Sequence, residues 1–194
     1  MTDARTIAVY DKGAAAYATL SRSAPDADLR AFMQLLTPGG RILDYGCGPG
    51  GSAVLLQMAG FSVDAFDAAP GMVALARSRG VAARLATFND PIPQDLDGVF
   101  ANFSLLHAPR ADLPRHLGQI AQALVPGGIC HLGMKTGEGS ARDAIDRLYT
   151  YVTPGDLHDM LTDVGLTVLS SREGLDKGFA GTDDPVVIIL SRKI

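Results

Sequence analysis

Glycines and acidic residues gather around one turn of the chain, LDYGCGPGG at residues 43–51. Glycine lets a backbone turn tightly and approach a ligand where a Cβ atom would clash. The apolar helix expected next, at 52–60, would direct its free N–H groups into the same space. Gly46, Gly48 and Gly51 also satisfy G-x-G-x-x-G, a spacing typical of dinucleotide-binding turns. The turn therefore indicates a bound small molecule that Gly46 and Gly48 contact.

Two carboxylates narrow the chemistry of this ligand. Asp44 precedes Gly46 by two residues, where a dinucleotide-binding strand normally carries an apolar residue. A carboxylate there suits a cationic aminoacyl group and repels a pyrophosphate. Asp67 ends the next expected strand and can accept hydrogen bonds from both hydroxyls of a ribose. Because S-adenosylmethionine and NAD share adenosine, Asp67 indicates an adenosine ligand without choosing between the two.

Around this turn, short apolar runs alternate with helical patterns, which is typical of βαβ units in a parallel sheet. The helices that we expect are 10–20, 26–40, 52–60, 70–80, 111–124 and 153–165, the last with Thr153 as its N-cap. The strands that we expect are 41–46, 62–67, 82–88, 97–104, 128–135, 166–173 and 185–193. The loop between the last two is too short for a helical crossover, so they should pair antiparallel. The sequence thus predicts an α/β fold: a single doubly wound, Rossmann-like domain with a seven-stranded, mostly parallel sheet and an antiparallel C-terminal strand.

Length and composition set further bounds. A chain of 194 residues with no linker-like stretch fits one domain, with residues 1–40 as a helical cover and 41–194 as the sheet core. The net charge of -4 argues against a nucleic-acid partner held through phosphates. Two cysteines form no disulfide framework or zinc spacing, so no metal is expected. Without a signal-peptide pattern or a membrane-length apolar run, we expect a cytoplasmic protein.

Four motifs in the expected order resemble class I S-adenosylmethionine-dependent methyltransferases. LDYGCGPG is similar to their first motif, VDAFDAAPGMVALAR to the second-strand acid and its helix, DGVFANFSLLH to the fourth-strand motif, and ALVPGGICHLGMK to the element around the fifth strand. The resemblance covers about residues 10–194 and implies S-adenosyl-L-methionine as the cofactor. SLLH, LxPGG, K-x-G-E-G and R-x-Y-T-Y-x-(T/S)-P most resemble small bacterial members of the tellurite-resistance-like type.

This resemblance also implies where the cofactor binds. The residues that we expect to bind it are Tyr10, Asp44, Gly46, Gly48, Asp67, Met72, Thr87, Phe88, Asn89 and Asn102. Met72 would lie against the adenine ring, with a place in the core as the alternative. The acid usual after the third strand is missing, unless Asp90 replaces it. The backbone carbonyl of Asn102 would hold the amino group of the methionine, with Phe103 and Ser104 facing the methyl donor.

Other residues have open roles. His107 is the candidate general base, or a hydrogen-bonded histidine at a helix start. Tyr10 and Tyr17 would cover the cofactor, or pack as core aromatics. A polar set follows the fifth strand: Lys135, Glu138, Arg142, Tyr149 and Tyr151. Within it, Glu138 and Arg142 have the spacing of a helical ion pair. Alternatively, the set forms a pocket for a polar or anionic substrate.

The expected activity is in-line methyl transfer to a small-molecule acceptor, achieved mainly by positioning the nucleophile in a dry pocket. An NAD- or FAD-dependent oxidoreductase is the alternative enzyme, and Asp44 with the terminal hairpin counts against it. A third alternative is a non-catalytic module that binds S-adenosylmethionine. The sequence does not name the methyl acceptor.

Overall fold

The computed structural model describes residues 3–19, 24–177 and 181–194. Residues 1–2 and 20–23 of the expected cover, and 178–180 of the expected hairpin loop, lie outside the described residues. The helices are α1 (Ala4–Ala18), α2 (Ala27–Gln34), α3 (Gly51–Met58), α4 (Pro70–Ser78), α5 (Leu113–Ala123) and α6 (Pro154–Asp163). The strands are β1 (Arg41–Tyr45), β2 (Ser62–Asp67), β3 (Ala83–Leu85), β4 (Leu96–Asn102), β5 (Leu124–Lys135), β6 (Ser140–Arg142), β7 (Leu148–Thr150), β8 (Leu166–Lys177) and β9 (Asp183–Lys193).

Seven strands form one sheet in the order β3-β2-β1-β4-β5-β9-β8. β9 runs antiparallel to both β5 and β8, whereas the pairs among the first five strands are parallel. The predicted seven-stranded sheet and its antiparallel strand are therefore confirmed. From β1 the chain winds outward to β3 and then returns to β4 on the other side of β1. This reversal creates the crevice at which open α/β sheets bind their ligands.

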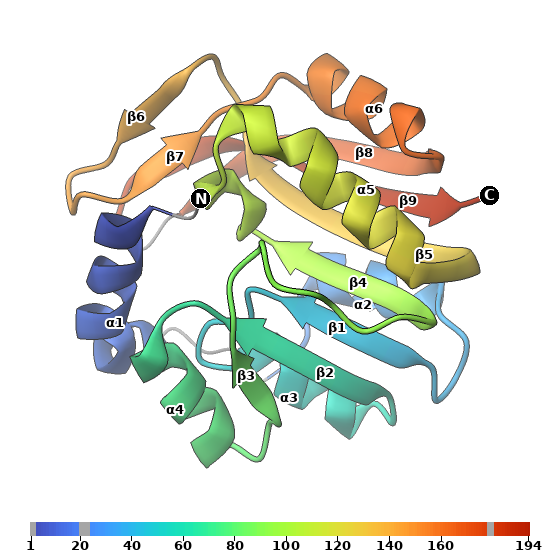
Figure 1. The fold of residues 1–194 in the computed structure, drawn as a ribbon, viewed down its shortest axis with the longest axis horizontal. Helices are drawn as coiled ribbons and strands as arrows, with labels where there is room; N and C mark the ends of the chain where they lie inside the picture. The colour runs from blue at the N-terminus through green and yellow to red at the C-terminus, as the bar shows by residue number, and fades with distance from the viewer. Residues whose placement is uncertain (1–2, 20–23, 178–180) are drawn as a thin grey trace.

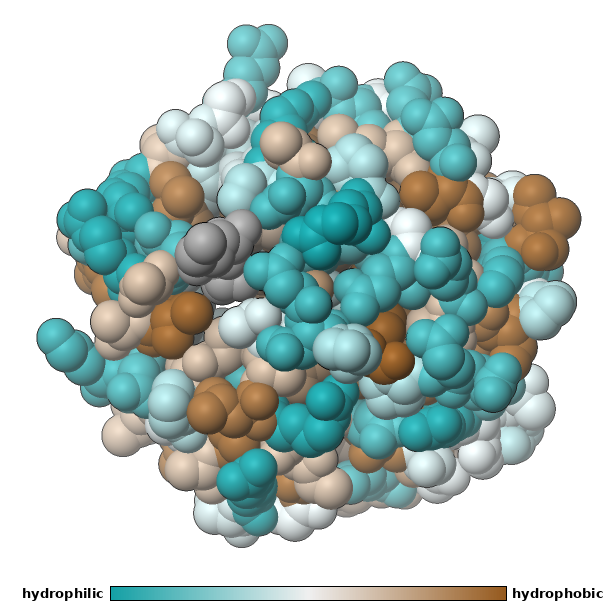
Figure 2. Space-filling view, in the orientation of Figure 1, coloured by the Kyte–Doolittle hydropathy of each residue, from teal (hydrophilic) through white to brown (hydrophobic). Residues whose placement is uncertain are grey.

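Helices cover both faces of the sheet, as expected for a doubly wound fold (Figure 1). α5 and α6 lie in front of it in this view, and α2 and α3 lie behind. The alternation of β1 sends Leu43 and Tyr45 into the front core and Ile42 into the rear core. Hydrophilic residues cover most of the front surface, with apolar residues in small separate patches (Figure 2).

The segment between β3 and β4 differs from the expected one. The third strand, expected at 82–88, ends at Leu85. Beyond it the Asp90 carboxylate accepts hydrogen bonds from the N–H and the hydroxyl of Thr87, at 2.7 and 2.8 Å. These bonds close a turn, because a local side-chain acceptor competes with the strand ladder for the backbone.

The segment after β5 corrects a second expectation. Glu138 and Arg142 do not share a helix, because Ser140–Arg142 forms β6 and pairs antiparallel with β7. The Asp143 carboxylate shapes the turn between these strands by accepting hydrogen bonds from the N–H groups of Ile145 and Arg147. The helical ion pair is therefore wrong. The hairpin β6–β7 that replaces it projects beside α1 at the left of Figure 1.

The N-cap predicted for α6 is confirmed. The hydroxyl of Thr153 accepts a hydrogen bond from the N–H of Asp156 at 3.1 Å, and the Asp156 carboxylate accepts one from the N–H of Thr153 at 3.2 Å. This reciprocal capping box satisfies two backbone donors at the helix start. No helix within the described ranges is long and apolar enough to cross a membrane.

Candidate active site

A cleft with two connected lobes opens at the carboxyl ends of the parallel strands. The first lobe is lined by Gly46, Asp67, Met72, Phe88, Ser104 and His107, among others. The second is lined by Asp44, Lys135, Arg147, Tyr149 and Arg172, among others. Their empty volumes are about 650 and 1790 Å³, open solvent included. The residues that line both, which we call the junction, are Tyr10, Tyr17, Gly46, Gly48, Asn102 and Phe103.

The two predicted glycines of the turn after β1 serve different purposes. Gly46 has a φ of 79°, and a Cβ atom there would lie 2.5 Å from the Cβ of Ser104. Packing therefore requires this glycine. A Cβ atom on Gly48 would meet nothing closer than a ring carbon of Tyr17 at 4.0 Å. The backbone of Gly48 thus faces the junction, where it can approach a ligand closely.

Asp67 lies at the end of β2 and connects two loops of the first lobe. Its Oδ2 accepts a hydrogen bond from the N–H of Gly48, and its Oδ1 accepts one from the N–H of Ala69, both at 2.9 Å. Each carboxylate oxygen has a second lone pair. Asp67 can therefore accept two ligand hydroxyls in the orientation that these backbone donors fix.

Asp44 is almost fully buried, and its Oδ2 has no hydrogen-bond partner among the described residues. Burial, followed by the negative charge of Asp67, raises the pKa of Asp44 to about 7. A buried carboxylate is costly unless it is paired. Because it lines the second lobe beside the glycine turn, it fits a cationic group of a ligand.

The residues predicted around an adenine ring divide into two groups. Met72 and Phe88 both line the first lobe. The ring of Phe88 is held by stacking on Tyr45, with centroids 5.2 Å apart and planes at 7°. Thr87 is held in its turn by Asp90, and Asn89 is exposed and accepts from Arg115 at 2.6 Å. Of the three residues expected after the third strand, the structure brings only Phe88 to the cleft.

His107, the candidate base, is fixed by hydrogen bonds on both ring nitrogens. Its Nδ1 lies 2.8 Å from the carbonyl oxygen of Leu148, which can only accept, so Nδ1 carries the proton. Its Nε2 then accepts from the hydroxyl of Tyr10 at 2.8 Å. Arg147 donates to that same hydroxyl at 2.9 Å. Burial lowers the pKa of His107 to about 4, so the ring stays neutral and its lone pair is engaged by Tyr10.

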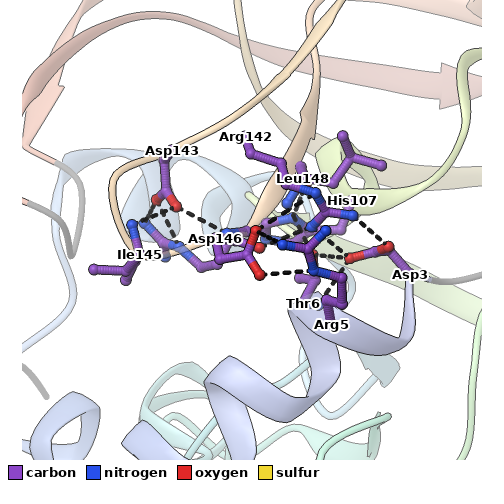
Figure 3. A network of polar contacts seen from close by, with 10 residues as sticks. Asp3, Arg5, Thr6, His107, Arg142, Asp143, Ile145, Asp146 and Leu148 are labelled. Atoms are coloured by element: carbon purple, nitrogen blue, oxygen red, sulfur yellow. Dashed lines mark hydrogen bonds and ion pairs between the residues drawn. The ribbon is translucent and has the colours of Figure 1, made fainter.

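The first turn of α1 is joined to the hairpin β6–β7 by ion pairs (Figure 3). Arg142 donates to both carboxylate oxygens of Asp3, at 2.8 and 3.0 Å. Arg5 donates to both carboxylate oxygens of Asp146, at 2.6 and 2.7 Å. The Arg142 guanidinium holds the pKa of Asp3 well below its usual range. Arg142 therefore fastens α1 instead of lining a substrate pocket.

Two buried cations form one wall of the second lobe. Lys135 pairs with Asp184 at 2.6 Å, and its ammonium lies 3.8 Å from the ring centroid of Tyr149. Arg147 pairs with Asp143 at 2.7 Å. Both cations line the lobe, whereas their carboxylate partners do not. This wall presents positive charge to the second lobe, which the Asp28–Arg172 ion pair also lines.

Sequence reasoning missed the role of Arg147. Arg147 is the first residue of the R-x-Y-T-Y motif. Its hydrogen-bond partner Tyr10 is 137 residues away, so residue spacing cannot predict the contact. Conversely, Glu138 is exposed outside both lobes, and Tyr151 lines neither of them. Within the described ranges, no group of His, Cys, Asp or Glu residues could hold a metal ion.

The state of His107 can be tested by nitrogen NMR of its imidazole. We expect the ring to titrate near pH 4 and to carry its proton on Nδ1 above that pH, because burial disfavours the charged form. In Tyr10→Phe, the Nε2 resonance should move while the proton stays on Nδ1. A midpoint near the ordinary value of 6.5, or an Nε2-protonated ring, would contradict this hydrogen-bond assignment.

Comparison with known proteins agrees with this geometry. Residues 42–128 match the model of the family described as Methyltransferase domain. The chain is 41% identical over 117 residues to a trans-aconitate 2-methyltransferase of Methylobacterium nodulans, covering 55% of this chain and 42% of that protein. It is 40% identical over 106 residues to one of Mycobacterium sp. (strain KMS), covering 50% and 41%. The chain thus spans less than half the length of the curated relatives it matches.

Solved structures share the fold. A SAM-dependent methyltransferase of Methanosarcina mazei superposes with a TM-score of 0.75 at 18% identity, covering 84% of this chain and 97% of that one. A TehB-like SAM-dependent methyltransferase of Corynebacterium glutamicum gives a TM-score of 0.73 at 19% identity, covering 96% and 99%. The glycine turn, the strand-end acids and the sheet order agree with these comparisons. Residues 42–128 are similar to the Methyltransferase domain family, and the chain shares the fold of these solved SAM-dependent methyltransferases.

Proposed function

We propose that this protein binds S-adenosylmethionine in the cleft and transfers its methyl group to a small-molecule acceptor in the second lobe. The observation that carries the proposal is Asp44, a buried carboxylate whose Oδ2 has no partner among the described residues, beside the glycine turn. The ammonium of an aminoacyl group would pair with it, whereas the pyrophosphate of NAD or FAD would be repelled.

The two lobes suit the two ends of this cofactor. In the first lobe, the carboxylate of Asp67 can accept hydrogen bonds from the ribose. Met72 and Phe88 form an apolar site there for the adenine ring. Asp44 lines the second lobe, so the sulfonium between the two ends would lie at the junction. The cofactor supplies a methyl group that is already activated by the positive sulfur. What the protein must contribute is a fixed, water-poor approach to that group, and Tyr10, Tyr17 and Phe103 line the junction.

The acceptor is proposed to be a small carboxylate. His107 is engaged by Tyr10 and kept neutral by burial, so its role as a base would require Tyr10 to move. An acceptor oxygen that is already anionic needs no base, and Lys135 with Arg147 offers it a cationic wall. The relatives named as trans-aconitate 2-methyltransferases support this class.

Two broader expectations stay part of this proposal. The whole chain, residues 1–194, is proposed to act as one methyltransferase domain, which is supported by the presence of α1 residues in both lobes. A cytoplasmic location is also proposed, in keeping with Cys47 and Cys130 as buried free thiols.

Calorimetric titration tests the cofactor. We expect S-adenosylhomocysteine to bind at least about tenfold more tightly than NADH. Because the pKa of Asp44 is raised to about 7 and the ligand ammonium needs the ionised carboxylate, affinity should rise from pH 5.5 to about 7 and then level off. Asp44→Asn should lower the affinity and flatten this dependence.

Tighter binding of NADH would overturn the methyltransferase proposal. Turnover separates an enzyme from a binding module: incubation of S-adenosylmethionine with trans-aconitate and other small carboxylates should release S-adenosylhomocysteine. If the cofactor binds and none of these acceptors is methylated, the carboxylate proposal fails.

The ribose contact is tested at Asp67. Asp67→Ala removes the acceptor for two ligand hydroxyls and also releases the N–H of Gly48, so S-adenosylhomocysteine affinity should fall by about 1.5–3 kcal/mol. Asp67→Asn keeps one acceptor oxygen and should lose less. Both variants should unfold cooperatively, since the residue lies at a strand end. Unchanged affinity in the alanine variant would show that Asp67 does not contact the ligand.

Hydrogen exchange tests whether α1 covers the cofactor. Arg142 and Asp146 hold its first turn to the hairpin, so residues 4–10 should be protected without ligand. Residues 11–18, which carry Tyr17, should slow markedly when S-adenosylhomocysteine is added. Arg142→Gln should raise exchange in residues 4–10 and leave α5 unchanged. Equal protection of residues 11–18 with and without ligand would identify the tyrosines as ordinary core residues.

A further inference from the structure

A buried histidine lies behind the end of β4. His131, in β5, is fully buried, and its ring stacks on Phe100 with centroids 4.2 Å apart. Its Nε2 lies 3.1 Å from the Oδ1 of Asn102. Burial lowers the pKa of His131 to about 3, so the ring is neutral. A protonated Nε2 facing an amide oxygen donates to it.

A histidine is unexpected at this buried position of the sheet. Its sequence neighbours Cys130 and Leu132 are apolar and equally buried, and its Nδ1 has no hydrogen-bond partner within the described part of the chain. A buried polar atom without a partner destabilises a protein compared with an apolar side chain of the same shape. The hydrogen bond to Asn102 engages the other ring nitrogen, and it offers a reason for the histidine.

Two further features mark the surroundings of Asn102. Gly133 is its partner in the β4–β5 register, and a Cβ atom on Gly133 would lie 2.6 Å from the Oδ1 of Asn102. Phe103, the next residue, has a φ of 54°, a left-handed conformation that is costly for a bulky side chain. Strain and buried polar groups concentrate at functional positions. His131 and Gly133 thus both favour one placement of the Asn102 side chain.

The hydrogen bond decides which part of the amide faces the cleft. Because Nε2 of His131 donates to Oδ1 of Asn102, the N–H groups of the amide are left to face the junction, which Asn102 lines. Two N–H donors suit a carboxylate. The aminoacyl end of the proposed cofactor carries one beside the ammonium assigned to Asp44, and Asp44 and Asn102 line the same lobe.

We propose that His131 is a positioning residue that holds the Asn102 amide with its N–H groups toward the carboxylate of the cofactor's aminoacyl end. This inference rests on the proposed function. His131, which lies outside both lobes, would then contribute to the affinity for the cofactor. The Asn102 side chain would contact the cofactor separately from its backbone carbonyl.

Two variants and two ligands test the proposal by calorimetry. His131→Phe keeps a ring on Phe100 and removes the donor, whereas His131→Gln keeps an N–H donor. The ligands are S-adenosylhomocysteine and S-adenosyl-3-thiopropylamine, which has the amine and lacks the carboxylate. We expect His131→Phe to weaken S-adenosylhomocysteine about five- to twentyfold and to leave the amine analogue unchanged. His131→Gln should recover most of the loss.

Thermal unfolding and a double variant complete the test. His131→Phe should unfold at the same temperature as the unmodified protein or higher, because the unsatisfied Nδ1 is removed. Asn102→Ala should show the same ligand selectivity, and adding His131→Phe to it should cause no further loss. If the His131→Phe substitution prevents folding, His131→Leu, which also removes the donor, is titrated with the same two ligands and decides.

Equal losses for both ligands, or unchanged S-adenosylhomocysteine affinity in His131→Phe, would overturn this inference alone. Failure of the unmodified protein to bind S-adenosylhomocysteine would instead overturn the proposed function, and this inference with it.

Discussion

The architecture of the cleft depends on the carboxylate of Asp67. By accepting from the N–H groups of Gly48 and Ala69, it ties the turn after β1 to the start of α4. The connection continues outward, because the N–H of Gly71 in α4 donates to Asp11 of α1 at 2.6 Å. α1 in turn brings Tyr10 to His107. Asp67 thus joins the turn after β1 to α4, and the further contacts of α4 and α1 hold the segments around the junction in place for a ligand.

The polar groups around the cleft are arranged for orientation more than for proton transfer. Burial keeps His107 and His131 neutral, and each makes directed hydrogen bonds to a residue of the junction. The cations Lys135 and Arg147 have carboxylates behind them, so neither is left buried and unpaired. Asp44 differs, because its Oδ2 has no partner among the described residues. Because a buried carboxylate is costly unless it is paired, the cleft favours a ligand that carries a cationic group.

The parts of the site that follow from local patterns could be predicted from the sequence. The seven strands of the main sheet, the glycine turn and the strand-end acids Asp44 and Asp67 depend on short stretches with strong conformational preferences, whereas the hairpin β6–β7 was not predicted. Thr87 and Asn89 could not be placed correctly, because the end of β3 depends on how Asp90 satisfies the backbone. Contacts between distant segments could not be predicted from the sequence either. The Tyr10–Arg147 hydrogen bond joins residues with no shared pattern, and His131 stands between the apolar residues Cys130 and Leu132.

The position of β9 has a consequence for synthesis on the ribosome. β9 follows β8 in the chain, yet it lies between β5 and β8 in the sheet. Until β9 emerges from the ribosomal exit tunnel, β8 has no strand to pair with and β5 keeps an open edge. The nascent chain then exposes two unpaired edges, a state that favours misassociation with other chains. Folding of this sheet is therefore expected to finish only after β9 has been synthesised, and chaperones that shield strand edges would act on the chain before that point.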